Sequence, residues 1–225
     1  MVGTSGRSEL WTPRYSYSEA DYLADVSKGT SKRWLRGYEY QRDGSAFVMP
    51  AVTPHVAVEG ALSFIDLVEV AAIGRLKEFG FSLQGIRRIV LDSKAHFEVE
   101  RPLSTRIFKV GGREAFVMDG GVLVAVGDRN RGKQAWDQVL GPFLDELDYD
   151  VGLARRWWPL GKSHTVVVDP DYGYGLPVIA GSGVRTEIVS ERVQAGDLPD
   201  EIARDFNLTS EEVGRALQFE LKRAA

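Results

Sequence analysis

The feature that most constrains the fold of this chain is a change in the spacing of its apolar residues. From 63 to 91 they recur every three or four residues, which is typical of helices with one buried face. Between 97 and 127 they occur in short aliphatic and aromatic runs separated by two Gly-Gly pairs, as in strands joined by turns. After 185 the helical spacing returns. The pattern predicts an α+β fold in which helical regions flank a small β-rich region.

The length favours a modular organisation. A chain of 225 residues is long for one ordinary domain and sufficient for two or three small ones. Apolar residues make up 44% of the sequence, which is enough for packed cores. The changes of pattern therefore predict domains at 1–95, 96–164 and 165–225.

The first domain begins with a predicted helix-turn-helix. Ser residues can cap a short helix over 16–25, and Thr30 can cap a second one that stops at Gly37. The residues that follow, 38–58, are aromatic and β-branched on both sides of Asp43-Gly44, a dipeptide that favours a hairpin. A hairpin in this position is expected to be a wing.

The rest of the chain predicts further helices and strands from the same signals. In order, these are helices over 63–80 and 82–91, strands within 105–110, 114–119 and 122–127, a helix over 131–147 broken near Gly141-Pro142, strands within 154–160 and 164–168, and helices over 186–196, 198–206 and 209–225. Asn207-Leu208 is expected to form the turn between the last two helices.

Composition excludes several classes of protein. The chain has no Cys, so disulfides and thiolate metal sites are excluded. Its apolar runs are too short to span a bilayer, and its first residues lack the basic-then-apolar layout of a secretory signal, so we expect a cytoplasmic protein without a membrane anchor. The net charge of −4 means that any binding to nucleic acid requires a local basic patch.

Such a patch is present around the second predicted helix. Cations cluster there, and Glu39 alone opposes them locally. A recognition helix needs side chains that reach base edges and cations that neutralise phosphates, so a DNA-binding site fits this placement, and a solvated basic helix face is the alternative. The candidate DNA contacts are Lys28, Thr30, Ser31, Lys32, Arg33, Arg36 and Arg42.

Two segments of the first domain resemble the DNA-binding domain of MerR-type regulators. These segments are YSYSEADYLADVSKGTSKRWLRGYEY and LSFIDLVEVAAIGRLKEFGFSLQGIRRIV, of which LSF and EFGFSLQGIRRI are the most specific parts. The resemblance implies a winged helix-turn-helix that binds double-stranded operator DNA as a dimer. The long helix through which that family dimerises is not apparent after Leu91, and the absence of Cys excludes sensing through thiols.

The last sixty residues resemble a small antitoxin domain with a helix-turn-helix-like arrangement. The segment from 166 to 220 carries the match, including DPDYGYGLPVIAGSGVRT, AGD, EIARDFNLT and EEVGRAL. That family includes VapB-type antitoxins, whose partner is a PIN-domain ribonuclease. The resemblance implies that this chain binds and neutralises such a toxin.

The last helix is better suited to protein than to DNA. Glu211 and Glu212 lie at its start, where they would repel phosphate. Its apolar stripe could contact a toxin or a second copy of the chain, or pack on its own core, and its cations could pair with the acidic site of a PIN nuclease. A second candidate patch combines Arg with Trp, a composition enriched at binding hot spots, although these Trp residues could equally be core. The candidate toxin or dimer contacts are Arg155, Arg156, Trp157, Trp158, Val213, Arg215, Leu217, Leu221, Lys222 and Arg223.

Signatures of catalysis are weak. His96, Glu98 and Glu100 alternate as on a strand, but a charged strand edge is much commoner than a metal site. The acidic run from Asp145 to Asp150 is expected to be solvated, and the glycines between 173 and 183 lack the spacing and the Lys of a phosphate loop. We therefore expect neither an enzyme nor a bound metal or cofactor.

The sequence as a whole predicts an antitoxin that neutralises a PIN-domain ribonuclease and represses its own operator as a homodimer. One alternative is a MerR-like transcription regulator whose central β-rich region binds a small molecule. A more distant alternative is a nuclease that uses the acidic run.

Overall fold

The computed structural model describes residues 9–53, 60–109, 136–163 and 165–224, and these residues form a mixture of helices and small sheets. The chain divides into two compact units, which we call the N-terminal unit (Trp11–Leu144 and Tyr149–Ala154) and the C-terminal unit (Met1–Leu10, Asp145–Asp148 and Arg155–Ala225). The mixed α and β composition agrees with the predicted class. The division differs from the three expected regions, because residues of the central region lie in both units.

The N-terminal unit begins with two short helices, α2 (Tyr17–Leu23) and α3 (Thr30–Arg36). Ser16 caps α2 in a capping box, since its Oγ accepts from the Glu19 N–H while the Glu19 carboxylate accepts from the Ser16 N–H. Both helices were expected from the sequence. A short strand before them, β1 (Tyr15–Ser16), pairs antiparallel with β4 (Ala61–Leu62).

The start of α3 is held by a side chain from α2. The Asp21 carboxylate is almost completely buried and accepts hydrogen bonds from the backbone N–H groups of Gly29 (2.6 Å) and Ser31 (2.7 Å). The cap expected at Thr30 is therefore wrong: Thr30 is the first residue of the helix, and Gly29 occupies the cap position. A carboxylate from elsewhere in the fold satisfies the free N–H groups instead.

A hairpin follows α3, as predicted. Its strands, β2 (Tyr38–Arg42) and β3 (Ser45–Met49), pair antiparallel from Tyr38 opposite Met49 to Arg42 opposite Ser45. The two turn residues, Asp43 and Gly44, both have positive φ (53° and 77°), which suits the right-handed twist of a two-residue hairpin.

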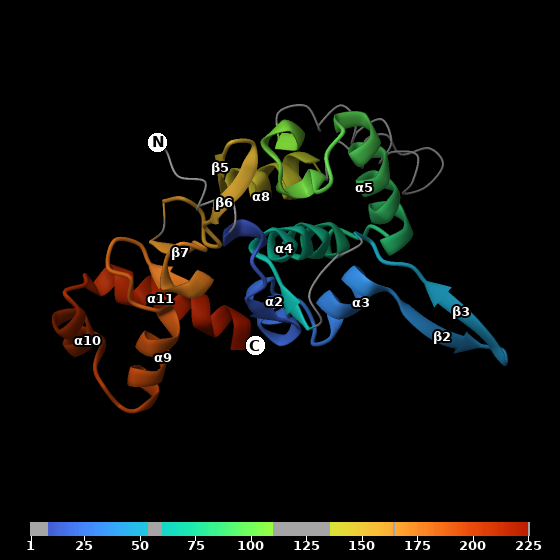
Figure 1. The fold of residues 1–225 in the computed structure, drawn as a ribbon. Helices are drawn as coiled ribbons and strands as arrows, with labels where there is room; N and C mark the ends of the chain where they lie inside the picture. Colours follow the sequence, from blue (N-terminus) through green and yellow to red (C-terminus); the bar gives the residue numbers. More distant parts are fainter. Residues whose placement is uncertain (1–8, 54–59, 110–135, 164, 225) are drawn as a thin grey trace. The chain divides into compact units, whose positions relative to one another are not determined.

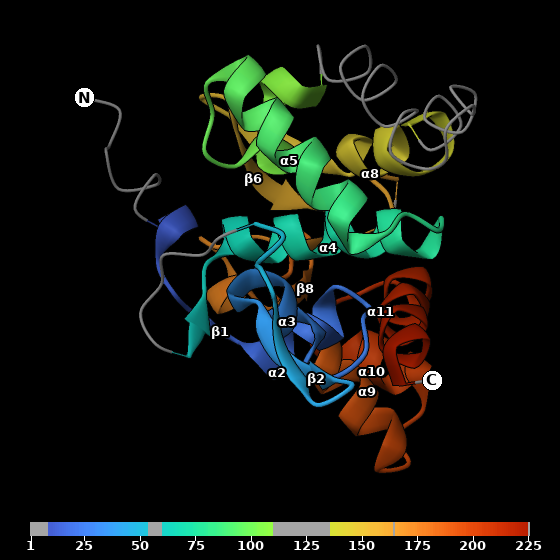
Figure 2. The ribbon, with the colours of Figure 1, turned by 90° about the vertical axis from the view of Figure 1, so that its right-hand side faces the viewer.

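Helix α4 (Phe64–Glu78) is the centre of the N-terminal unit. It lies between α5 (Leu83–Phe97) on one side and α2 with α3 on the other (Figures 1 and 2). A helix covered on several sides is apolar around most of its surface, and twelve of the fifteen residues of α4 are buried. Ser63 and Ser82 cap the two helices, and both helices were expected.

The segment after α5 departs from the expected strands. Helix α5 continues to Phe97, so His96 is helical and Glu98 is a left-handed residue at the helix end rather than part of a strand. Residues 106–109 are helical, so the strand expected over 105–110 is wrong there. The strands expected at 114–119 and 122–127 lie outside the described residues. Short helical segments follow at η1 (Pro102–Ser104), η2 (Trp136–Leu140) and α8 (Gly141–Asp145).

A buried polar cluster joins η1 to α4. The Arg101 guanidinium pairs with Asp66 (2.8 Å) and donates to the Thr53 Oγ1 (2.9 Å), while the Ser104 N–H donates to the Glu69 carboxylate (3.2 Å). Burial raises the pKa of Glu69 from 4.5 to about 7, although the Arg101 guanidinium acts in the opposite direction. The cluster ties Thr53 and the start of η1 to α4.

A four-stranded sheet has the order β5-β6-β7-β8. Its strands are β5 (Leu147–Asp150), β6 (Leu153–Trp157), β7 (Val166–Val168) and β8 (Pro177–Ile179). Strands β6 and β7 were predicted, whereas β5 and β8 were missed. The acidic residues of β5 conceal its alternation, and β8 follows the short helical turn η3 (Gly173–Gly175) in a glycine-rich segment.

The C-terminal unit ends in three predicted helices, α9 (Thr186–Gln194), α10 (Pro199–Phe206) and α11 (Ser210–Ala224). Asn207, with φ of 54°, forms the left-handed turn between the last two helices, as expected. The helices enclose a core of Ile179, Val189, Ile202, Ala203, Val213 and Ala216. Across the described part of the chain, no helix is long and apolar enough to cross a membrane.

Candidate nucleic-acid interface

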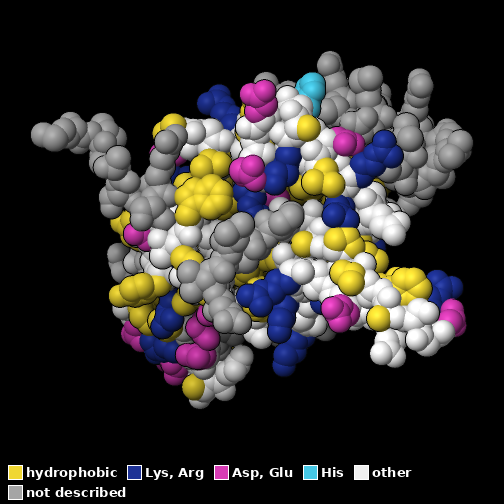
Figure 3. Space-filling view, turned by 45° about the vertical axis from the view of Figure 1, so that its right-hand side comes forward, with side chains coloured by type: hydrophobic (Ala, Val, Ile, Leu, Met, Phe, Trp, Pro, Cys, Tyr) yellow, Lys and Arg dark blue, Asp and Glu magenta, His cyan; other side chains and the backbone are white. Residues whose placement is uncertain are grey.

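The exposed face of α3 carries three cations. Lys32, Arg33 and Arg36 are exposed, while Trp34 and Leu35 point into the core, so the helix separates charge from apolar surface. The Arg36 guanidinium lies 6.0 Å from the centre of the Tyr17 ring, which orients it. The helix contains no acidic residue. Figure 3 shows Lys and Arg side chains gathered at the base of the hairpin.

Two other predicted cations lie beside this face. Lys28 is exposed in the loop before α3, and Arg42 is exposed at the end of β2. Arg42 lies 3.6 Å from the Asp43 carboxylate, but both side chains are more than three quarters exposed, so this ion pair contributes little stability and does not prevent Arg42 from binding a phosphate.

Thr30 and Ser31 are not available for binding at this face. Ser31 is fully buried, and its Oγ donates to the Tyr17 carbonyl (3.1 Å). Thr30 is 6% exposed, and its Oγ1 accepts from Arg33 (3.3 Å). The sequence-based assignment of Ser31 to DNA contact is therefore wrong, because its side chain holds α3 against α2 instead.

The hairpin adds an aromatic surface that sequence reasoning had not assigned to the site. Tyr38, Tyr40 and Phe47 are all more than a third exposed, and the Tyr40 ring lies 6.0 Å from Tyr38 and 5.6 Å from Phe47. Pairing of Tyr40 with Phe47 and of Arg42 with Ser45 places Arg42 on the same face as these rings. The alternation Tyr-x-Tyr-x-Arg was the available signal.

The Arg-Trp patch of the C-terminal unit is largely occupied by internal contacts. Trp157 is buried and donates from its Nε1 to Glu146 (2.9 Å), whereas the half-buried Trp158 donates to Asp148 (2.7 Å). Trp157 is therefore a core residue, and its assignment as a contact is wrong.

The two arginines of this patch also have internal partners. Arg155 pairs with Asp171, and Arg156 pairs with Asp169 at 2.5 Å. The hydrogen bond to Asp169 raises the pKa of Arg156 above its ordinary value. These pairs connect β6 to the segment after β7.

The acidic run is structural rather than freely solvated. Asp148 pairs with Lys162 at 2.8 Å. Partial burial opposes its ionisation, but hydrogen bonds from Lys162 and Trp158 lower the pKa of Asp148 below its usual range. Within the described ranges, no group of three or more His, Asp or Glu side chains is arranged to hold a metal ion.

The candidate contacts on α11 divide into buried and exposed residues. Val213 is fully buried in the core, so its assignment as a contact is wrong, and Leu217 is half-buried. Leu221 is 70% exposed, and Arg215 lies 3.7 Å from Glu211 on the helix surface. The side chains of Lys222 and Arg223 lie outside those that the structure describes.

Comparison with known proteins finds one matching family model and several similar proteins. A model of the family described as a protein of unknown function (DUF433) matches residues 166–219, which run from β7 into α11. The whole chain is similar to two proteins of Mycobacterium tuberculosis. One is named "Uncharacterized protein Rv2308", at 25% identity over 92% of this chain and 90% of that protein. The other is named "Putative antitoxin VapB45", at 26% identity over 91% of this chain and 92% of that protein.

A solved structure shares the fold. The crystal structure of Rv2018 from Mycobacterium tuberculosis matches with a TM-score of 0.68 at 21% sequence identity, covering 92% of this chain and 98% of that one. The similarity therefore extends across both units rather than over the C-terminal segment alone.

Proposed function

We propose that this protein is the cytoplasmic antitoxin of a type II toxin–antitoxin module, which binds operator DNA and neutralises a PIN-domain ribonuclease. One observation carries the DNA-binding part: Lys32, Arg33 and Arg36 are exposed together on a helix that has no acidic residue. The antitoxin part is supported by similarity over nearly the whole chain to a protein with an antitoxin name. The two activities are assigned to different units.

The N-terminal unit offers the chemistry that duplex DNA requires. The cations of α3 would approach the groove and its phosphates, and Arg42 on the projecting hairpin would contact the flanking backbone. The buried bonds of Asp21 and Ser31 hold α3 against α2, so its cations are presented on a fixed helix. The net charge of −4 makes this local surface decisive for affinity.

The DNA-binding proposal is tested by salt dependence. The double variant Arg33→Ala/Arg36→Ala should bind the region upstream of its own gene more weakly, and the slope of log affinity against log salt should fall by about 0.9 for each lost phosphate contact. Arg185→Ala/Arg204→Ala removes the same charge from the C-terminal unit and serves as the control. Equal affinity and slope in the two double variants would remove α3 from the interface.

The toxin-binding proposal is tested by co-expression with a PIN-domain protein encoded beside this gene. We expect the two chains to co-purify and the ribonuclease activity to be lost in the complex. A toxin that remains fully active and forms no stable complex with this chain would contradict the proposal.

Leu221 is the best residue for locating the contact surface of α11. Because it is 70% exposed, Leu221→Asp should leave the fold intact. We further propose that the protein is a homodimer, since helix-turn-helix proteins usually read paired half-sites. Light scattering would show whether the variant still dimerises, and pull-down would show whether it still binds the toxin. If the variant keeps both activities, this part of α11 belongs to neither contact surface.

A further inference from the structure

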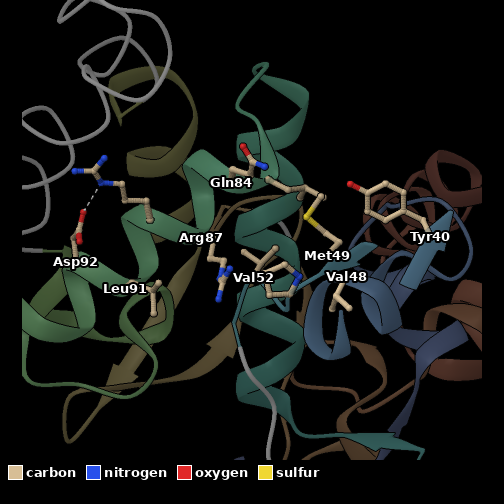
Figure 4. A pocket seen from close by; sticks show the side chains of 11 residues that line it. Tyr40, Val48, Met49, Val52, Gln84, Arg87, Leu91 and Asp92 are labelled. Atoms are coloured by element: carbon tan, nitrogen blue, oxygen red, sulfur yellow. Dashed lines mark ion pairs between the residues drawn. The ribbon is translucent and has the colours of Figure 1, made fainter. Parts of the chain in front are cut away.

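A groove of about 300 Å³ lies in the N-terminal unit between the hairpin and α5, apart from the exposed face of α3. One wall is formed by the end of β3 and the residues after it, and the other by the exposed side of α5 (Figure 4). The lining mixes polar and apolar side chains, and the apolar ones are Val48, Met49, Pro50, Val52, Leu83 and Leu91. Its volume lies at the lower end of the range for small-molecule sites.

The apolar walls of this groove are incompletely covered. Val48 is 69% exposed and Leu91 is 46% exposed, so both keep apolar surface in contact with water. A ligand with an apolar body would remove this surface from water, which is the main source of affinity in such sites. A DNA backbone, in contrast, presents charged phosphates and gains little from aliphatic walls.

Two arginines on adjacent positions of α5 differ in their partners. Arg88 lies 3.5 Å from the Asp92 carboxylate, one turn further along the helix. Arg87 is half-buried, and no acidic side chain among the described residues pairs with it. Figure 4 shows the Arg87 side chain between Leu91 and Val52.

A guanidinium that pairs with none of the described acidic side chains, beside apolar ones, has a definite complement. Arginine binds carboxylates through two parallel hydrogen bonds, and partial removal from water strengthens that interaction. The Gln84 amide and the Tyr40 hydroxyl also line the groove and supply neutral hydrogen-bonding groups. The groove thus combines the Arg87 guanidinium, the Arg88–Asp92 ion pair, two neutral polar groups and apolar side chains.

We propose that the groove between the hairpin and α5 binds a small carboxylate with an aromatic or branched apolar body, whose carboxylate pairs with Arg87. The apolar body lies against Val52, Met49 and Leu91. Because β3 forms one wall, the bound ligand contacts the hairpin directly. The site shares Tyr40 with the aromatic surface of the hairpin, but it includes none of the cations of α3 and none of the candidate toxin contacts.

The test uses 2-naphthoate and benzoate as probes, titrated into the full-length protein and followed by calorimetry and amide NMR shifts. We expect 2-naphthoate to bind more tightly than benzoate and to shift amides of β3 and α5. Arg87→Gln should weaken binding about tenfold or more, since a charge-assisted hydrogen bond is lost. Arg106→Gln, at an exposed arginine of the same unit that does not line the groove, is the matched control and should bind as the unaltered protein does. Arg87→Lys keeps the charge without the bidentate geometry and should be intermediate.

Three results would overturn the proposal. These are no binding of either carboxylate to the unaltered protein, equal binding by the Arg87→Gln variant, and equal affinity for 2-naphthamide or inorganic phosphate, which lack the charge or the apolar body. The same variants in the DNA-binding assay separate the two proposals. Loss of DNA affinity in Arg87→Gln without carboxylate binding would assign the guanidinium to a phosphate contact instead.

Discussion

Single side chains of the same chemical type have different roles in this protein according to their burial. The carboxylate of Asp21 is buried and caps α3, whereas that of Glu69 is buried beside a cation and close to a second acid. Ser31 and Lys32 are neighbours in the sequence, yet one is part of the core and the other is exposed. Residue type and spacing indicated a polar helix start, but only packing decided which of these polar groups face water.

Glu69 should make the stability of the N-terminal unit depend on pH. Its pKa is about 7 in the folded protein and 4.5 as its ordinary value, so the folded state binds the proton more tightly, and stability is lost as the pH rises from about 4.5 to 7. Glu69→Gln removes this titration. Relative to the variant, the unaltered protein should lose up to about 3 kcal/mol of unfolding free energy between pH 5 and pH 8. Denaturant unfolding at both pH values measures this loss of unfolding free energy. If the unfolding free energies of the two proteins changed in parallel with pH, the raised pKa would not belong to Glu69.

At the scale of elements, the spacing and capping residues of single segments predicted most helices, but they did not predict all of the strands beside them. Ser16 and Ser82 cap helices as their positions suggested, because a capping bond involves residues only three apart. The Asp43-Gly44 turn likewise depends on two residues. Strands β5 and β8 each lie beside the next or the preceding strand of the chain, but they were missed because the composition of a short strand is a weak guide.

Gly37 controls where the hairpin leaves α3. Its φ is 74°, and a Cβ at this position would lie 2.4 Å from the Met49 carbonyl oxygen. Gly37→Ala should therefore move the base of the hairpin and cost more than the roughly 1 kcal/mol of a positive φ alone. Gly44→Ala is the control, since its φ is 77° and a Cβ there meets no atom within 4 Å. Denaturant unfolding should rank Gly37→Ala as the less stable variant, and the reverse order would contradict this account.

At the scale of the whole molecule, the chain forms two compact units rather than the three expected regions. The second boundary was predicted near 164, yet β6 and the residues after it already belong largely to the C-terminal unit. The relatives match this chain across both units, so the shared fold includes both of them.

Separate cores should allow the two activities to be lost separately. Ile202 is fully buried in the core of the C-terminal helices, so Ile202→Ala should destabilise that unit by about 2–5 kcal/mol. Leu198→Ala, at a position 62% exposed, should change stability by less than about 0.5 kcal/mol. We expect Ile202→Ala to lose toxin binding on mild heating while DNA affinity persists. Simultaneous loss of both would show that the two units unfold as one.

The sequence by itself determined most of the helices, the caps at Ser16 and Ser82, the hairpin turn and the basic character of α3, because each depends on residues close together in the chain. Only the tertiary structure decided that Ser31, Trp157 and Val213 are buried rather than available for contact. It also brought the hairpin beside α5, where Arg87, which pairs with no acidic side chain that the structure describes, lines a groove. Burial and pairing arise from contacts between distant segments, and the spacing of residues along one segment does not contain that information.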